Sequence, residues 1–421
     1  MNLKQFKFNR QDRIVLHADF DSFFASCEQH FNPNLRNIPI GVTAANGRTC
    51  IIAASKEAKR YGIKTGARTW EAQQICPEII FVKADFERYL DVTKKFIAIA
   101  STYSTLVEVF SLDEVFIDLT PVANLYDSID QVVYKLKKQI ADEIGPIITV
   151  SVGVSYNKLL AKLASGLSKP DGYAVIDRQN INEVYKNTKL TDICGIGERY
   201  KRRLNMLGIF TFEQLKNYPI HLLKAEFGKI ASQNLKRIGF AYDDSPVVSY
   251  LEEVDAKSVG RNYCLPQNEY DQKKIKQIIF ELSEEIAIKL RRIKKRCRTV
   301  GLYFSGEGAE GGRKTVNSYI NQGKEIFDVC MYLYNSWKWN GMVRQMGIWT
   351  SNLIDDCYTT PSLFENANMG AISRTIDRIN DRFGHHVVRR GFVLNAPKLK
   401  TEPNGFFADR YIRKTLGYNN T

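Results

Sequence analysis

Two short apolar segments of the chain carry carboxylates at one end. Residues 13–19, RIVLHAD, are rich in β-forming residues and end at Asp19, and residues 114–119, EVFIDL, begin at Glu114, directly after Asp113. Apolar segments of this length and composition are typical of buried strands. Packing gives no reason for a charge at the end of such a strand. If the two strands are neighbours, the three carboxylates lie around one point at the edge of a sheet.

A cluster of three carboxylates indicates a cation site, because uncompensated negative charge is costly where water is partly excluded. Hard oxygen ligands favour magnesium. Two such ions, roughly 3.5–4 Å apart, are typical of in-line phosphoryl or nucleotidyl transfer. The alternative for either carboxylate cluster taken alone is an ordinary solvated acid at a strand end. The residues by themselves therefore predict a two-metal phosphoryl-transfer centre and no particular substrate.

The N-terminal part of the chain, up to about residue 175, has the pattern of an α+β domain. A third apolar segment at 148–154 predicts another strand, and residues 128–143 and 158–167 have helical periodicity. Residues 53–75 predict two helices, separated at Tyr61-Gly62. These two helices would form a small subdomain inserted between the first two strands.

The remaining pattern changes at a polar, proline-containing stretch that predicts a linker near residues 243–255. Before it, residues 177–242 predict short helices punctuated by glycine. After it, a long basic helix at 271–298 precedes the strand TVGLYF, and a helix at 323–336 precedes a strand near 345–350. This second half predicts a compact α/β unit.

The C-terminal tail after Asp355 is polar and rich in turn-forming residues. Residues 371–384, AISRTIDRINDRFG, have the pattern of an amphipathic helix. We expect the tail to be partly disordered when it stands alone, because its composition offers little apolar surface to bury.

The charge balance predicts a polyanionic partner. The 421-residue chain has a formal net charge of +14, and Lys and Arg side chains that neutralise phosphates gain from counterion release. Charge alone leaves DNA, RNA and acidic lipid open. No apolar stretch is long enough for a membrane span or a signal peptide. The expected location is therefore the cytoplasm, without a membrane partner.

Five ordered motifs resemble the Y-family DNA polymerases, which copy past damaged bases. The motifs lie between residues 13 and 352 and are, in chain order, HADFDSFF, EAKRYGIKTG, EVFSLDEVFIDLT, SVGVSYNKLLAKLASGLSKPDG and a GIG at 195–197. Lys56 stands where many members have a tyrosine, which fits better the branch of bacterial SOS-mutagenesis polymerases, close to DNA polymerase IV. The resemblance implies a template-directed polymerase that adds deoxynucleotides to a primer 3′ end.

The resemblance also implies the α+β architecture of a right hand: a palm with a ferredoxin-like antiparallel sheet, small fingers, a helical thumb and an α/β little finger. The implied boundaries are 1–22 and 88–176 for the palm, 23–87 for the fingers, 177–242 for the thumb, 243–255 for the linker, 256–352 for the little finger and 353–421 for the tail.

Carried over one residue at a time, the resemblance implies an active site for two Mg²⁺ ions. Asp19, Asp113 and Glu114 match the metal-binding carboxylates, together with the main-chain carbonyl of Phe20. Phe24 matches the steric gate, an aromatic ring that leaves no room for a ribose 2′-hydroxyl. The other implied contacts are to the triphosphate, from Lys59, Lys169 and the amides of Phe23 and Phe24, and to the nascent base pair, from Ile52 and Gly66.

Two further segments have the pattern of DNA-backbone contacts. Residues 194–209 predict a helix-hairpin-helix, in which the backbone of Gly195 and Gly197 approaches a phosphate closely and Lys201 follows. The basic run at 289–298 would by itself be a solvated face. If the segment belongs to a little finger, the resemblance implies that the run contacts DNA. The DNA-contacting residues that the resemblance implies for this domain are Lys257, Arg261, Arg296, Arg298 and Arg344.

The tail contains TPSLFEN at 360–366, which resembles the family's sliding-clamp peptide. Leu363 and Phe364 would fill a hydrophobic pocket of the clamp, although Thr360 stands in place of the usual glutamine. The predicted partners are thus primer-template DNA, deoxynucleoside triphosphates and a sliding clamp, with the chain acting as a monomer. Two alternatives stay open: a nucleotidyl cyclase, and a catalytically weak DNA-binding accessory of a mutagenesis complex.

Overall fold

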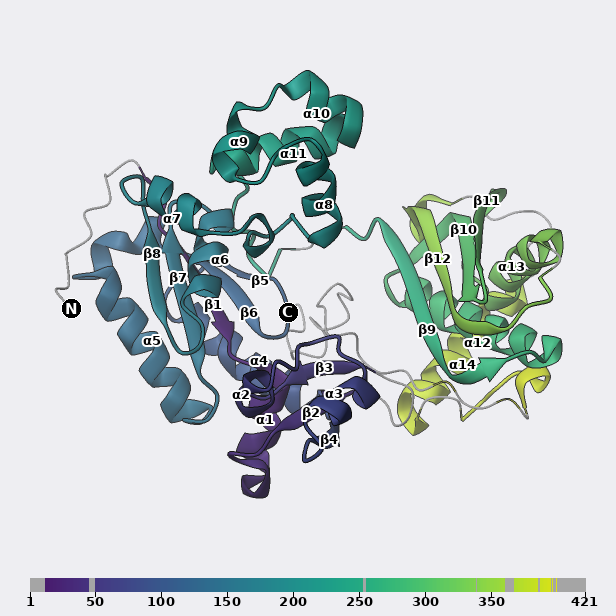
Figure 1. Cartoon of the computed structure of the whole chain (residues 1–421). Coiled ribbons are helices and arrows are strands. Elements are labelled where there is room, and N and C mark those ends of the chain that lie inside the picture. The colour runs from purple at the N-terminus through teal and green to yellow at the C-terminus, as the bar shows by residue number, and fades with distance from the viewer. Residues whose placement is uncertain are drawn as a thin grey trace. The chain divides into compact units, whose positions relative to one another are not determined.

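The structure, a computed structural model, describes residues 12–44, 50–252, 255–337, 339–359, 367–384, 387–394, 396 and 399. The described chain divides into two compact units, one up to residue 252 and one from residue 255 onward. Each unit has its own hydrophobic core and combines helices with a sheet (Figure 1), which confirms the predicted α+β class. None of the described helices combines the length and apolar character that a bilayer crossing requires.

A five-stranded sheet with the order β5-β6-β1-β7-β8 forms the centre of the first unit. Its strands are β1 (Val15–Phe20), β5 (Val107–Val109), β6 (Glu114–Asp118), β7 (Val150–Ser155) and β8 (Tyr173–Ile176). The pairs are antiparallel except β7–β8, which is parallel. The expectation of an antiparallel sheet therefore holds for all but one edge, where a crossover helix joins two strands that must run in the same direction.

Helices cover both faces of this sheet. The long helices α4 (Phe86–Ser101) and α5 (Ile129–Glu143) share one core with the sheet, and α6 (Lys158–Leu167) packs on β7, β1 and β8. Sequence periodicity predicted α5 to within a residue and α6 at its observed bounds. At Gly153 of β7 a Cβ atom would lie 2.1 Å from the Ala161 carbonyl oxygen, so only glycine allows α6 to approach this closely.

A small three-stranded sheet, ordered β3-β2-β4, follows β1 in the chain. The predicted helical segment at 53–75 was wrong at its start: residues up to Ala54 belong to a strand, because they pair with the buried strand β2. Ser55 then caps the first helix, and the predicted break at Tyr61-Gly62 is confirmed. The elements are α1 (Phe23–Phe31), η1 (Pro33–Leu35), β2 (Ile40–Thr43), β3 (Ile51–Ala54), α2 (Lys56–Arg60), α3 (Thr69–Ile75) and β4 (Ile80–Lys83).

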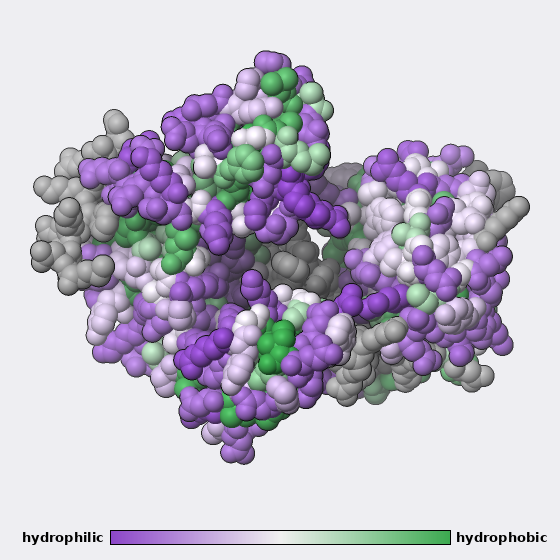
Figure 2. Space-filling model, in the orientation of Figure 1, coloured by the Kyte–Doolittle hydropathy of each residue, from purple (hydrophilic) through white to green (hydrophobic). Residues whose placement is uncertain are grey.

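Short helices complete the first unit, as the glycine pattern predicted. They are α7 (Ile181–Asn187), η3 (Leu190–Asp192), α8 (Glu198–Met206), α9 (Phe212–Asn217), α10 (Ile220–Phe227) and α11 (Lys229–Gly239), with η2 (Thr120–Leu125) earlier in the chain. Gly208 and Gly228 adopt positive φ between successive helices, which is the conformation that glycine tolerates best. The visible surface is mainly hydrophilic, with apolar residues exposed over this group (Figure 2), among them Ile220 and Leu222.

The second unit contains a four-stranded antiparallel sheet, ordered β11-β10-β12-β9, and helices, of which the first two contact each other. Its elements are β9 (Ser258–Glu269), α12 (Gln272–Arg292), β10 (Lys295–Gly306), β11 (Ala309–Ile320), α13 (Gly323–Trp337), β12 (Val343–Asp355), η4 (Asp356–Tyr358), α14 (Ala367–Phe383) and η5 (Gly391–Val393). The helix predicted at 371–384 is thus present as α14. The helix predicted at 271–298 ends earlier, because residues from Lys295 onward pair with β12.

Candidate active site

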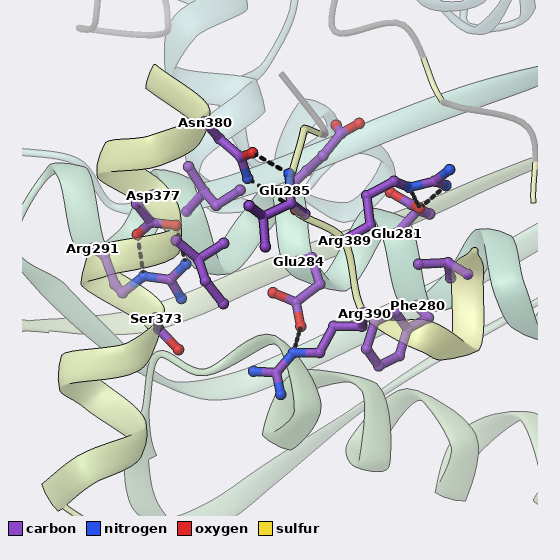
Figure 3. A pocket seen from close by; sticks show the side chains of 14 residues that line it. Phe280, Glu281, Glu284, Glu285, Arg291, Ser373, Asp377, Asn380, Arg389 and Arg390 are labelled. Carbon is purple, nitrogen blue, oxygen red and sulfur yellow. Dashed lines mark hydrogen bonds and ion pairs between the residues drawn. The ribbon is translucent and has the colours of Figure 1, made fainter. Parts of the chain in front are cut away.

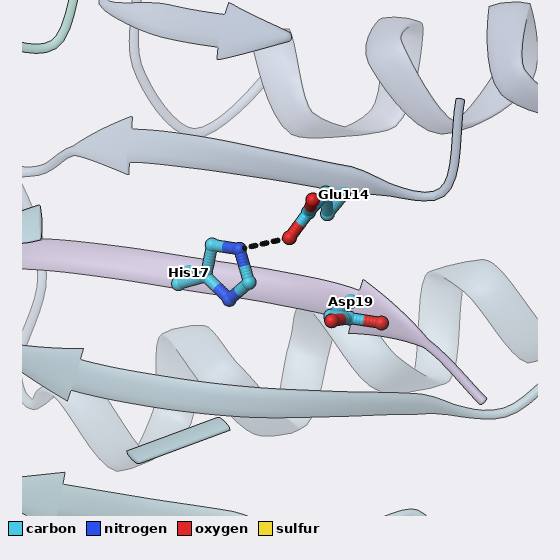
Figure 4. A group of neighbouring side chains, drawn as sticks. All are labelled: His17, Asp19 and Glu114. Atoms are coloured by element: carbon cyan, nitrogen blue, oxygen red, sulfur yellow. Dashed lines mark hydrogen bonds and ion pairs between the residues drawn. The ribbon is translucent and has the colours of Figure 1, made fainter. Parts of the chain in front are cut away.

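The register of two strands brings Asp19 and Glu114 together. β1 and β6 pair so that Asp19 is directly opposite Glu114, and the amide of Phe20 donates a hydrogen bond to the Asp113 carbonyl oxygen at 2.9 Å. The side chains of Asp19 and Glu114 are only 16% and 12% exposed. The predicted meeting of these strand ends is therefore observed (Figure 4).

His17, which was not predicted from the sequence, contacts the carboxylate of Glu114. Its Nε2 lies 2.9 Å from Glu114 Oε2 and its Nδ1 lies 2.7 Å from Ser165 Oγ. Burial lowers the pKa of His17, which favours the uncharged ring. A carboxylate can only accept, so Nε2 donates to Glu114. The Ser165 hydroxyl beside Nδ1 donates to the Lys162 carbonyl oxygen at 2.9 Å. Ligand atoms of His17, Asp19 and Glu114 lie within 4.8 Å of one another.

Two lysines compensate the charge of the carboxylates. Lys169 Nζ lies 2.5 Å from Asp19 Oδ1 and 3.4 Å from the Phe20 carbonyl oxygen. Lys162, also missed from the sequence, pairs with Glu114. Lys169 therefore contacts two of the predicted metal ligands, and its contact with a triphosphate stays a prediction.

The carboxylates differ in their affinity for a proton. Burial raises the pKa of Asp19 and of Asp113, whose Oδ1 accepts a hydrogen bond from Ser111 Oγ at 2.5 Å. Burial would also raise the pKa of Glu114, but the hydrogen bond from His17 and the charge of Lys162 lower it to about 2. A cation between carboxylates that lie this close together, where water is partly excluded, would stabilise their ionised forms. The donor set thus fits a hard metal ion.

Asp21, the second acid of the DFD motif, is not available as a metal ligand. Its carboxylate is 3% exposed and accepts hydrogen bonds from Thr149 Oγ1, Ser151 Oγ and the amide of Asp171 at 2.7–2.8 Å. Lys56 Nζ in turn donates to Thr149 Oγ1 at 2.9 Å. Asp21 therefore ties β1 to neighbouring segments, and Lys56, which departs from the family pattern, joins this network.

Phe24, the predicted sugar gate, belongs to a cluster of aromatic side chains. Phe24 in α1 is partly buried and stacks on Tyr89, with ring centroids 4.6 Å apart. Tyr89 is fully buried, and its hydroxyl donates to Glu28 Oε1 at 2.6 Å. Phe23 is 3% exposed and belongs to the core. Of the two neighbouring rings, Phe24 is the more exposed one.

The remaining predicted nucleotide contacts lie on the small sheet and its helices. Lys59 Nζ donates to Ser22 Oγ at 2.7 Å, and burial together with the charge of Lys169 lowers the pKa of Lys59. Lys59 and Lys169 are therefore close enough for their charges to repel each other. Ile52 is in β3 and partly buried, and Gly66, at φ +90°, donates its amide to the Ile51 carbonyl oxygen.

The predicted helix-hairpin-helix segment contains two glycines between the short helix η3 and α8. Gly195 has φ +101°, and Gly197 is the N-cap of α8. Lys201, in the first turns of α8, forms an exposed ion pair with Glu198 at 3.5 Å. The helix N-terminus with its glycines can therefore approach a phosphate, and contact with DNA stays a prediction.

The predicted DNA contacts of the second unit differ in accessibility. Lys257 and Arg344 are exposed. Arg261 pairs with the buried Glu285 at 3.0 Å, and Arg296 pairs with Asp356. The guanidinium of Arg298 donates to the Val316 carbonyl oxygen at 3.2 Å and lies over the Tyr319 ring. The predicted clamp residues Leu363 and Phe364, with Thr360, lie outside the described residues.

Comparison with known proteins identifies the family. Residues 18–166 match the model of the impB/mucB/samB family, and residues 256–363 match the model of its C-terminal domain. A DNA polymerase IV of Pelotomaculum thermopropionicum is 33% identical over 93% of this chain and 98% of its own length, and one of Acetivibrio thermocellus is 30% identical over 91% and 98%.

A solved structure has the same fold. A chimeric Y-family DNA polymerase built from Dbh and Dpo4 aligns with a TM-score of 0.70 and 27% identity, over 81% of this chain and 99% of the chimera. The chain therefore belongs to the impB/mucB/samB family, whose members are Y-family polymerases, and it is a DNA-directed DNA polymerase.

Proposed function

We propose that the chain copies DNA past damaged bases, with error-prone insertion, by a two-metal mechanism. The observation that carries the proposal is the pairing of Asp19 with Glu114 at adjoining strand ends, next to Asp113. These carboxylates and the Phe20 carbonyl would hold two Mg²⁺ ions. Such ions, when bound, lower the pKa of the attacking 3′-hydroxyl and stabilise the leaving pyrophosphate.

The side chains around the carboxylates would bind and orient the nucleotide. Lys169 would exchange its contact with Asp19 for a phosphate oxygen, and Lys59 would bind the triphosphate from α2. Phe24 would exclude a 2′-hydroxyl, and Ile52 and Gly66 would contact the nascent base pair. We assign the five-stranded sheet to the palm, the small sheet to the fingers, helices α7–α11 to the thumb and β9–β12 to the little finger.

The direct test of the proposed function is primer extension with Mg²⁺ on undamaged and abasic templates. The full chain should extend the primer on both templates and pass the abasic site. A parallel assay for cyclic nucleotides addresses the cyclase alternative. Cyclic product without primer extension would contradict the polymerase proposal, and inactivity in both assays would favour the DNA-binding accessory.

His17→Ala should weaken metal binding by about 10–100-fold, as is typical when a group that orients a metal ligand is removed. Glu114 would lose the hydrogen bond that fixes its orientation. His17→Gln, which can place an N–H where Nε2 stands, should restore most of the affinity. The measurements are the Mg²⁺ concentration for half-maximal extension and calorimetric Mn²⁺ titration of the chain alone. Equal metal binding by the alanine variant and the parent would refute this role.

Clamp binding is proposed through Leu363 and Phe364. Because α14 and Leu399 pack within the second unit, deleting the whole tail would remove part of that unit as well as the peptide. The sharper variant is Leu363→Ala with Phe364→Ala in the full chain. In a pull-down with the sliding clamp, this variant should lose retention that the parent shows. Equal retention of the two proteins would exclude the peptide as the clamp contact.

A further inference from the structure

The C-terminal helix α14 pairs its acidic side chains with α12 and leaves three of its arginines exposed. The guanidinium of Arg291 donates to both carboxylate oxygens of Asp377, at 2.7 and 2.8 Å, and Arg292 pairs with Asp381. Both acids of the helix thus face α12. Three exposed arginines form what we call the α14 arginine face: Arg374, Arg378 and Arg382.

The side of α14 that faces α12 anchors the helix firmly. Arg291 and Asp377 are 9% and 12% exposed, and this fork-like pair is among the stronger side-chain contacts. Around them lies a cavity of about 110 Å³, lined also by Ile376, Asn380 and the Arg389–Glu281 pair (Figure 3). These contacts fix the rotation of the helix, so the opposite side is held towards solvent.

Among the described residues, the arginines of the α14 arginine face form no ion pair. Arg378 donates to Thr375 Oγ1 at 3.2 Å, and the guanidinium of Arg382 lies 5.2 Å from the Phe383 ring centroid. Within the part of the chain that the structure describes, none of the three arginines pairs with a carboxylate. Their spacing of four residues stacks them along one side of the helix over about 12 Å.

We infer that the α14 arginine face binds the sugar-phosphate backbone of DNA without reading its sequence. The inference rests on the proposed function, in which DNA is the polyanion that the chain binds. The planar fork of arginine suits phosphate oxygens, and about 12 Å of duplex carries about seven phosphate charges, enough for all three side chains. This contact is additional to those predicted on β9, β10 and β12.

An acidic bilayer is the alternative partner for this face. A helix that lies in a membrane interface buries a free apolar side. In α14, Ile376 lines the cavity against α12, whereas Ile372 and Phe383 are 47% and 64% exposed. The proposed function favours DNA, and the vesicle measurement below separates the two partners.

The test replaces all three arginines in the full chain, as R374Q/R378Q/R382Q, with R374K/R378K/R382K as the matched control. Fluorescence anisotropy gives the affinity for labelled primer-template between about 50 and 200 mM KCl. The glutamine variant should bind about tenfold or more weakly at the low-salt end, and its slope of log affinity against log salt should fall by about three. The lysine variant keeps the charge and should keep the slope.

Several outcomes would overturn the inference. An unchanged slope in the glutamine variant would do so, with or without a loss of affinity, because removed phosphate contacts must change the salt dependence. Loss of binding to phosphatidylserine vesicles with unchanged DNA binding would assign the face to a membrane instead. Failure of the proposed function appears separately, as a parent chain that binds primer-template but does not extend it at saturating DNA.

Discussion

Asp113→Asn combined with Glu114→Gln is expected to reduce primer extension at least about a thousandfold, which corresponds to about 4 kcal/mol of lost transition-state stabilisation. The amides retain the shape of the side chains and can still accept hydrogen bonds from Ser111 and His17. They lack the negative charge that would hold the cations. The measurement is single-turnover extension at saturating Mg²⁺ and nucleotide, beside the thermal unfolding temperature of each protein.

A matched control is available elsewhere in the first unit. Asp142 and Glu143 are an adjacent pair of acids at the end of α5 and are exposed. Asp142→Asn with Glu143→Gln removes the same formal charge and should leave extension unchanged. Extension by the Asp113 and Glu114 variant within about tenfold of the parent, a gap of only about 1.4 kcal/mol, would remove these carboxylates from the metal site.

Phe24→Ala should allow ribonucleotides into the product. The loss of discrimination between deoxynucleotides and ribonucleotides is expected to be about 100-fold, the order that steric exclusion in a pocket provides. The ring is a firm barrier because it stacks on the buried Tyr89, which Glu28 holds in place. The measurement is kcat/KM for each deoxynucleotide and its ribonucleotide counterpart opposite the same template base.

Two further variants separate a steric gate from general loosening. Phe24→Tyr keeps the ring and should keep the exclusion of ribonucleotides. Phe86→Ala removes another ring that contacts both Phe24 and Tyr89, and it should leave the sugar preference unchanged. If Phe86→Ala admits ribonucleotides as readily as Phe24→Ala, the preference depends on the whole cluster, and the gate assignment is lost.

Local patterns predicted the elements whose residues act within one segment. The helix at 158–167 was placed at its observed bounds because its apolar spacing is strong, and the break at Tyr61-Gly62 follows from glycine. Errors arose where pairing with distant residues outweighed local preference. Residues from Lys295 look like the end of a basic helix, but their backbone pairs with β12. Residues up to Ala54 pair with β2 in the same way.

The carboxylates themselves could be found from the sequence, because a charge at the end of an apolar strand needs a reason. His17 had a weaker signal: it is two residues before Asp19, and alternate residues of a strand share one face. Lys162 and Ser165 had none, because periodicity identifies a helix but not the strand against which it packs. The partners of Arg296 and Arg298 were equally hidden.

The sequence by itself determined the α+β class, the three carboxylates and a basic chain suited to a polyanion, because composition and short-range periodicity carry that information. Only the tertiary structure decided that Asp19 is opposite Glu114, that His17 contacts both Glu114 and Ser165, and that α14 pairs its acids with α12 and leaves three arginines exposed. These facts depend on strand register and helix rotation, which are set by contacts between residues far apart in the chain.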